Sequence, residues 1–404
     1  MREATVQGTC HPDFDLVRQE FARNFAERGE LGASLHITLD GEAVVDLWGG
    51  IADPASGRPW EADTLAVVYS CTKGIVALAA HILVDRGLLD LEAPVSDYWP
   101  EFGCAGKEHT TVRMLLDHSA GLPAVDGPVQ PGDMYDADTM ASHLARQRPW
   151  WEPGTRNGYH LVTFGWTVGE VVRRVSGLSI GQFIAKEIAE PLGADFYLGL
   201  PEELEDRVAP ITVWTPGPDY IPTPYMLAMN SRPDSVQAMA MGNVLAAGVD
   251  ANSRPFRAAE LGGMGGVASA RGLAALYTPL ALGGGSLVSN DTVARMSQTA
   301  VATSEDALLL IPTRFGLGFM TSMDNRRRGP RAAGSSVILG PSAFGHVGMG
   351  GSLGMADAAE RIGFAYVMNK HGEGMLLNDK GQSLVDATYR SLGCRTNDPG
   401  VWTR

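Results

Sequence analysis

A serine and a lysine one helical turn apart open the most apolar stretch of the chain. Ser70 precedes Lys73 by three residues, and the run from Ile75 to Val84 that follows is apolar on nearly every side. Such a run predicts a helix buried inside a domain, with both polar side chains on one side of its first turn. The free backbone N–H groups of that turn can stabilise an anion. This combination indicates nucleophilic catalysis by Ser70 with Lys73 as its base.

The alternative is structural, with Ser70 as an N-cap residue and Lys73 as a solvated charge. A lysine in the first turn opposes the helix dipole, so an ordinary helix start favours Asp or Glu there. A Ser-x-x-Lys match alone has low specificity. Its position is the stronger evidence, because among the lysines of the chain only Lys73 has a serine three residues before it.

Two further stretches carry groups that suit a catalytic site. Tyr159 follows a Pro-Gly pair and enters an apolar helical period at 162–175, where its phenol could act as an acid or base, or simply pack. His346 begins the glycine-rich strand edge His-Val-Gly-Met-Gly-Gly, which a ligand could approach closely. An isolated histidine at such a place is otherwise structural.

A second serine competes with Ser70 for the role of nucleophile. The residues around Ser352 read Gly-Gly-Ser-Leu-Gly, which fits the G-x-S-x-G nucleophile elbow. That elbow needs a strand before it, a helix after it, and an Asp and a His further along the chain. Too little chain follows Ser352 to complete a parallel sheet, and His371 is the sole later histidine. The elbow is therefore the weaker hypothesis.

The elements that would position these groups follow from hydrophobic periodicity. Apolar residues from Phe14 to Phe25 form one helical stripe, and the strand-like runs 33–39 and 43–48 meet at Asp40-Gly41, a strong hairpin signal. The later pattern predicts helices at 139–147, 162–175, 179–189, 268–282 and 381–392, and strands at 315–320, 336–339 and 364–368.

Strand signals therefore lie at both ends of the chain and helical signals in its middle. We expect an α+β fold in which an antiparallel sheet is flanked by N- and C-terminal helices, with an all-helical lobe inserted. Residues 1–96 and 241–404 would form the α/β lobe, and residues 97–240 the mainly helical lobe. The active site would lie between the two lobes.

Composition excludes several classes of function. The net charge of −14 and the lack of any Lys/Arg block beyond residues 326–328 argue against nucleic acid as a partner. No apolar run is long enough to cross a membrane, and the N-terminus lacks the apolar core of an export signal. The four cysteines are scattered like free thiols of a reducing compartment, and no metal-binding motif occurs. We therefore expect a cytoplasmic protein without metal or cofactor.

Taken in order, three motifs resemble those of the serine β-lactamase/penicillin-binding-protein superfamily. Ser70-Cys71-Thr72-Lys73 matches its Ser-x-x-Lys, Tyr159-His160-Leu161 stands at its Tyr-x-Asn, and His346-Val347-Gly348 stands at its Lys-Thr-Gly. The likeness covers roughly residues 10–392 and is nearest to the class C β-lactamase-like carboxylesterases, called family VIII esterases.

The resemblance implies a fold, an activity and a set of residues. It implies hydrolysis of small-molecule carboxylic esters through an acyl-enzyme on Ser70, with Lys73 and Tyr159 as general acid and base. The N–H groups of Ser70 and Met349 would bind the oxyanion. The same resemblance places Gly348, His346 and His160 beside the substrate.

Departures from the family pattern bear on the substrate. Leu161 replaces the Asn of Tyr-x-Asn, and His346 and Val347 replace the Lys and Thr that suit a carboxylate. These changes argue against β-lactams and D-Ala peptides as main substrates. An acyltransferase, a weak β-lactamase or D-aminopeptidase-like amidase, and a non-catalytic binding module remain alternatives, and the oligomeric state stays open. We expect the apolar loop 220–226 to pack on its own domain rather than to line the cleft.

Overall fold

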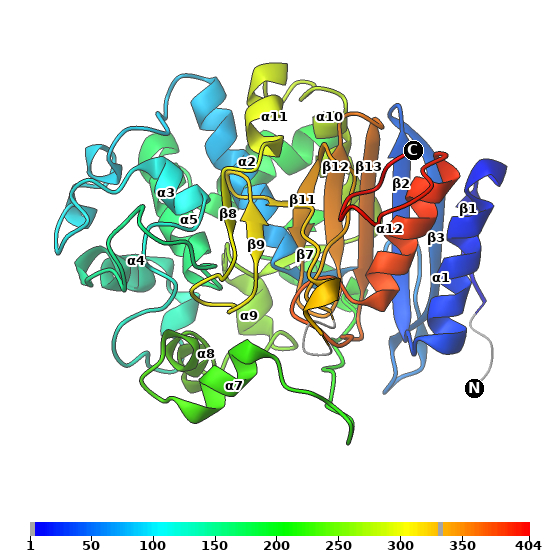
Figure 1. Ribbon diagram of the computed structural model, residues 1–404, viewed down its shortest axis with the longest axis horizontal. Coiled ribbons are helices and arrows are strands. Elements are labelled where there is room, and N and C mark those ends of the chain that lie inside the picture. The colour runs from blue at the N-terminus through cyan, green and yellow to red at the C-terminus, as the bar shows by residue number, and fades with distance from the viewer. Residues whose placement is uncertain (1–4, 330–333) are drawn as a thin grey trace.

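A ten-stranded sheet has only antiparallel pairs in the computed structural model, which describes residues 5–329 and 334–404. The sheet extends from the middle of the molecule to the right-hand side of Figure 1, and α3 (Val112–Leu116), α4 (Ala137–Arg146) and α5 (Thr163–Ser176) lie on the left. Along the sheet the order is β1 (Gln7–Cys10), β3 (Glu42–Asp53), β2 (Gly32–Leu39), β13 (Ile362–Met368), β12 (Leu353–Asp357), β11 (Ala343–Val347), β10 (Met320–Thr321), β9 (Thr313–Phe315) and β8 (Val301–Thr303). The short β4 (Arg58–Pro59) pairs with β3. Residues 1–4 and 330–333 of the expected α/β lobe lie outside the described residues.

The sheet begins with the hairpin that the sequence predicts. Asp40 and Gly41 join β2 to β3 with φ angles of 54° and 88°. Positive φ at both central residues is what a type I′ turn requires, and its twist matches that of the strands. The hairpin prediction is confirmed.

Further along the chain, the strand predictions are only partly right. The expected strand 315–320 is split, because the chain turns at Gly318, whose φ is 88°, between β9 and β10. The expected strand 336–339 was wrong, since Ser336 and Val337 make only isolated bridges.

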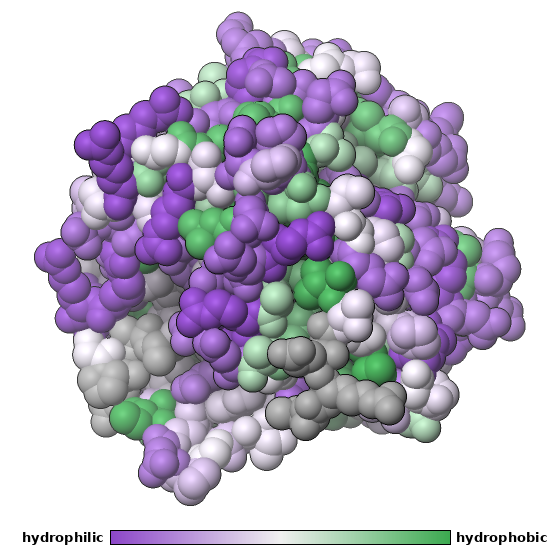
Figure 2. Space-filling model, turned by 90° about the vertical axis from the view of Figure 1, so that its right-hand side faces the viewer, coloured by the Kyte–Doolittle hydropathy of each residue, from purple (hydrophilic) through white to green (hydrophobic). Residues whose placement is uncertain are grey.

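Helices cover both faces of the sheet. α1 (Asp15–Glu27) packs against α12 (Asp379–Ser391), and α10 (Ala270–Ala281) contacts β13, β12 and β2. The side chains of β13 belong to two separate cores, so helices are needed on both faces of the sheet. Phe364, Tyr366 and Met368 lie in the core under α1 and α12. The alternate residues Ala365 and Val367 join the core that contains α10. The side of the molecule that carries α1 and β1 is largely hydrophilic (Figure 2).

The terminal helices on the antiparallel sheet and the helix-rich middle of the chain confirm the predicted fold class. The remaining helices are α2 (Cys71–Asp85), α6 (Ile180–Ile184), α7 (Pro224–Ser231), α8 (Val236–Ala246), α9 (Arg254–Ala258) and α11 (Asn290–Ser297). A π-helical turn, Ala185–Ala189, continues α6.

A second, three-stranded sheet joins distant segments of the chain in the order β5 (Ala66–Tyr69), β7 (Gly266–Ala268), β6 (Phe196–Tyr197). β6 belongs to the segment 97–240, which is therefore not purely helical. The division of the chain at residues 97 and 240 stays a prediction.

α2 is the central helix that the apolar run predicts. Every residue from Cys71 to Leu83 is buried, and the helix contacts α5, α6, β5 and β11. Its first turn is therefore held by both sheets and by the helical segment together. None of the helices in the described residues has the length and apolarity needed to cross a membrane.

Candidate active site

Ser70 lies at a sharp junction between β5 and α2. Tyr69, the last residue of β5, has a φ of 44°, which is unusual for a residue with a side chain and costs about 1–3 kcal/mol. Ser70 occupies the N-cap position of α2, but its hydroxyl makes no capping hydrogen bond to the helix. The structural explanation of Ser70 as a helix cap is therefore wrong. Its hydroxyl instead faces Lys73.

Lys73 is fully buried and has three polar neighbours. Its Nζ lies 3.0 Å from Ser70 Oγ and 2.7 Å from each of the backbone oxygens of Leu161 and Gly263. Burial lowers the pKa of Lys73 well below its ordinary value. A neutral amine has two N–H donors and one lone pair. If the two carbonyls accept both N–H groups, the lone pair is left for the Ser70 hydroxyl proton.

Tyr159 completes the group beside Ser70. The Nζ of Lys73 lies 4.8 Å from the centroid of the Tyr159 ring. Phe315 stacks on this ring at 5.7 Å, and the ring of His118 lies 5.0 Å away. Burial raises the pKa of Tyr159, and the Ser70 side chain opposes that rise. The phenol is therefore protonated at neutral pH and can donate its proton.

Asp306 fixes the backbone at Tyr159. Both of its carboxylate oxygens lie 3.0 Å from Tyr159 N, and the N–H groups of Leu308 and Leu309 donate to it at 2.9 and 2.8 Å. The hydroxyl of Thr313 adds a donor at 3.2 Å. Burial raises the pKa of Asp306 to about 6, and these hydrogen bonds oppose the rise. Sequence reasoning missed Asp306, because it ends the polar run 303–306, which reads as a surface loop.

The end of β11 lies against the start of α2. A Cβ at Gly348 would come within 2.2 Å of the backbone oxygen of Val68, so only glycine allows this approach. In the described residues, neither Ser70 N nor Met349 N donates to a protein acceptor. These two amides are therefore available to an oxyanion.

His346 is a neutral, enclosed histidine. Its Nδ1 lies 2.8 Å from the backbone oxygen of Val347, and its buried Nε2 has no partner among the described residues. Burial lowers the pKa of His346 to about 3. A neutral, buried ring does not replace the lysine that would hold a carboxylate.

Not every residue that the sequence singled out lines the cavity above Ser70: Lys73, His160, His346, Gly348 and Ser352 do not. His160 is fully buried, and its ring bonds Leu122 N at 2.9 Å and Gly158 O at 2.7 Å. Its expected place beside the substrate is therefore wrong, because both ring nitrogens already bond the backbone. Ser352 is also buried, and the segment containing it joins β11 to the antiparallel β12 rather than to a helix. This geometry excludes the nucleophile elbow.

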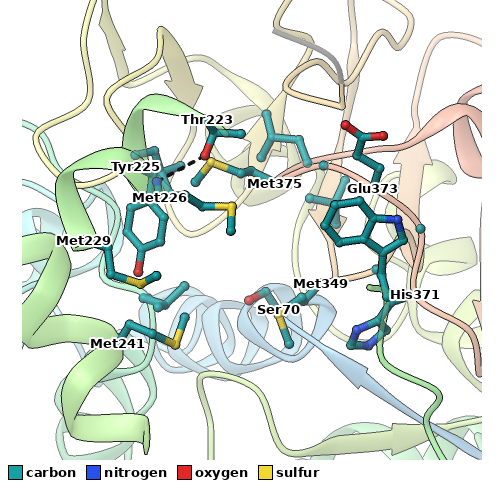
Figure 3. A pocket seen from close by; sticks show the side chains of 18 of the residues that line it. Ser70, Thr223, Tyr225, Met226, Met229, Met241, Met349, His371, Glu373 and Met375 are labelled. Carbon is teal, nitrogen blue, oxygen red and sulfur yellow. Dashed lines mark hydrogen bonds between the residues drawn. The ribbon is translucent and has the colours of Figure 1, made fainter. Parts of the chain in front are cut away.

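A cavity of about 430 Å³ opens above Ser70 (Figure 3). Ser70, Tyr159, Leu161, Val347 and Met349 line it. The loop that contains Tyr220 and Ile221, with α7, forms part of its wall. Our expectation that this loop packs only on its own domain was wrong. Among the described residues, no group of three His, Cys, Asp or Glu side chains could hold a metal ion.

Comparisons with known proteins agree with this fold and show the family to which the chain belongs. The sequence profile of the family described as Beta-lactamase matches residues 17–387. The chain is 35% identical over 386 residues to "Esterase/beta-lactamase LipL" of Mycobacterium tuberculosis (strain ATCC 25618 / H37Rv), over 93% of this chain and 85% of that relative.

Solved structures give the same result across almost the whole chain. A family VIII carboxylesterase has a TM-score of 0.83 at 40% identity, over 96% of this chain and 100% of that one. A penicillin-binding protein homologue from Caulobacter crescentus has a TM-score of 0.82 at 35% identity, again over 96% of this chain and 100% of that one. The chain belongs to the beta-lactamase family, as the resemblance of its three motifs predicted.

Proposed function

We propose that this protein is a carboxylesterase that forms an acyl-enzyme on Ser70. The observation that carries the proposal is the environment of Lys73, a buried amine held by two carbonyls with Ser70 Oγ at 3.0 Å. Relatives described as an esterase/beta-lactamase and a family VIII carboxylesterase support acyl transfer from an ester.

Acylation begins with proton transfer from the Ser70 hydroxyl to the neutral Nζ of Lys73, as Oγ attacks the carbonyl carbon of the ester. The oxyanion that forms accepts hydrogen bonds from the N–H groups of Ser70 and Met349. Each such donor contributes on the order of 3 kcal/mol to the transition state. The ester C–O bond then breaks, and the leaving alkoxide takes the proton of the Tyr159 hydroxyl.

Deacylation uses the same groups with water as the nucleophile. Lys73 returns its proton to Tyr159, so both groups regain their starting forms before water enters. The Lys73–Tyr159 pair then removes a proton from water as its oxygen attacks the acyl carbon, and Ser70 leaves with a proton. The steps need no proton donor or acceptor beyond Ser70, Lys73, Tyr159, the ester and water, and the products are a carboxylic acid and an alcohol.

The proposal favours esters over β-lactams. A β-lactam carries a carboxylate. At the position where the Lys-Thr-Gly motif has a lysine to bind that carboxylate, this chain has the neutral, buried His346. Val347, the next residue, has no hydroxyl to donate. Lys73 cannot serve instead, because its N–H groups are directed to Leu161 and Gly263.

The experiment compares two buried lysines in an assay with p-nitrophenyl butyrate. Lys107 is also buried, and its Nζ also bonds two backbone oxygens, those of Cys104 and Gln147, but it has no serine beside it. Lys73→Met should lower kcat by at least about 10²-fold, as the loss of a general base does. Lys107→Met should keep the turnover of the wild type per folded molecule. Equal losses in the two variants would overturn the proposal, because the two lysines share burial and bonds to backbone oxygens, and only Lys73 has a serine beside it.

A further inference from the structure

The walls of the cavity above Ser70 are mainly apolar. Six methionines line it, three from α7 and α8 and three from the strands and loops opposite: Met226, Met229, Met241, Met320, Met349 and Met375. In Figure 3, Met229 and Met241 lie on one side of the space around Ser70, and Met349 lies on the other side. Methionine side chains are flexible and polarizable, so such walls adapt to apolar groups of different shape.

The apolar surface continues from the cavity to the outside of the molecule. Leu245 and Val213 are 71% and 68% exposed, and both line this cavity. Ile221 and Met349 are exposed as well and also line it. These four side chains account for most of the large hydrophobic side chains that are exposed in the described residues. Exposed apolar groups that gather at one place mark a binding site.

The charged residues that line the cavity also favour an apolar, uncharged ligand. Within the described parts of the chain, no lysine or arginine lines it, and Glu373 is the one charged residue that does. A substrate with a carboxylate or phosphate would meet this carboxylate and find no cation. An apolar group would instead be removed from water on every side that the methionines cover.

We propose that the esters cleaved at Ser70 are uncharged and carry a medium-length apolar chain, which lies between α7–α8 and the residues around Met349 and Met375. This inference rests on the proposed function and names its class of substrate. Each methylene moved from water into such a wall can raise kcat/KM by up to about fourfold. An eight-carbon chain should therefore be preferred over acetate by at least about tenfold.

The kinetic test uses two pairs of esters, so that the chain is placed once on each side of the scissile bond. The pairs are p-nitrophenyl octanoate with p-nitrophenyl acetate, and octyl acetate with ethyl acetate. A preference of at least about tenfold for the longer member in either pair supports the proposal. A smaller preference, or a preference for the short member, in both pairs overturns it.

A pair of substitutions on α7 tests the wall itself. Met229 lines the cavity, whereas its neighbour Leu227 is 42% exposed and does not. Met229→Glu should lower kcat/KM for the longer ester at least about tenfold more than for the short one, because only the long chain removes the new carboxylate from water. Leu227→Glu should leave both values unchanged. If Met229→Glu does not fold, Met241→Glu on α8 gives the same test. The proposal is contradicted if the lining variant and Leu227→Glu have equal effects on the ratio of kcat/KM for the longer ester to kcat/KM for the short ester.

A binding measurement separates this inference from the proposed reaction. Ser70→Ala, titrated with methyl octanoate in a calorimeter, should bind it with a negative heat-capacity change, whereas methyl acetate should give no measurable heat. If Ser70→Ala still hydrolyses esters, the proposed reaction fails, whatever chain is preferred. If Ser70→Ala is inactive but binds the two esters equally, the reaction stands and the substrate class is wrong.

Discussion

Replacing Asp306 by asparagine should weaken catalysis without removing any group that touches the substrate. One carboxylate oxygen accepts from Tyr159, Leu308 and Leu309, and the other accepts from Tyr159 and Thr313. In Asp306→Asn one of these oxygens becomes an NH₂ group, which cannot accept from Tyr159 N. The backbone at Tyr159 should shift, and a small misplacement of a catalytic group lowers kcat by about tenfold or more while KM changes less.

Asp306→Asn should also change how the free energy of unfolding depends on pH, and the size of that change follows from the pKa of Asp306. Burial raises the pKa of Asp306 from 3.8 to about 6. An acid with a higher pKa in the folded state holds its proton more tightly there, so its contribution to stability falls as the pH rises from about 4 to about 6. At about 1.4 kcal/mol for each pH unit between those values, the loss is about 3 kcal/mol. The asparagine side chain of Asp306→Asn does not titrate, so the variant should gain about this much relative to wild type over that range.

Urea unfolding of both proteins at about pH 4 and about pH 7 measures this difference, and ester hydrolysis at neutral pH measures kcat. Asp136→Asn is the matched control. Asp136 is an exposed N-cap whose pKa is lowered by the backbone N–H of Thr139, so its variant should show a small change of opposite sign. The reasoning is refuted if Asp306→Asn shows the same pH dependence as wild type and an unchanged kcat.

Three further outcomes follow from the site. The kcat/KM for an ester should rise with pH as Lys73 loses its proton, and because burial lowers the pKa of Lys73, the rise should be complete well below about pH 10; a rise only near that value would contradict a neutral base. Gly348→Ala places a Cβ within 2.2 Å of Val68 O and should lower kcat by about 10²-fold, whereas Gly242→Ala, with open space around it, should not. A chromogenic cephalosporin should be hydrolysed far less efficiently than p-nitrophenyl butyrate, and comparable kcat/KM values for the two would show that His346 and Val347 do not exclude β-lactams.

The parts of the fold that the sequence predicts are those set by local patterns. The buried helix α2 follows from its unbroken apolar run, and the β2–β3 hairpin follows from Asp40-Gly41. Strands β11 and β12 gave weaker signals, because they are short and rich in glycine and alanine. The run at 336–339 is apolar enough for a strand, yet tertiary packing leaves it with isolated bridges only.

At the site, side-chain types were predictable and their surroundings were not. The two oxygens that hold Lys73 belong to the backbone of Leu161 and Gly263, 88 and 190 residues away, and backbone carbonyls carry no sequence signal. Asp306 reaches Tyr159 across 147 residues. His160 was predicted to lie beside the substrate and does not, because its position in a motif carries no information on the backbone groups that bond its ring.

The most direct test of the account is to find which serine carries the acyl group. The protein would be treated with a p-nitrophenyl alkylphosphonate, digested and analysed by mass spectrometry, alongside kinetics of Ser70→Ala and Ser352→Ala. The account predicts an adduct on the peptide that contains Ser70, a loss of at least about 10³-fold in Ser70→Ala, and most activity kept in Ser352→Ala. An adduct on Ser352, or an inactive Ser352→Ala beside an active Ser70→Ala, would contradict it.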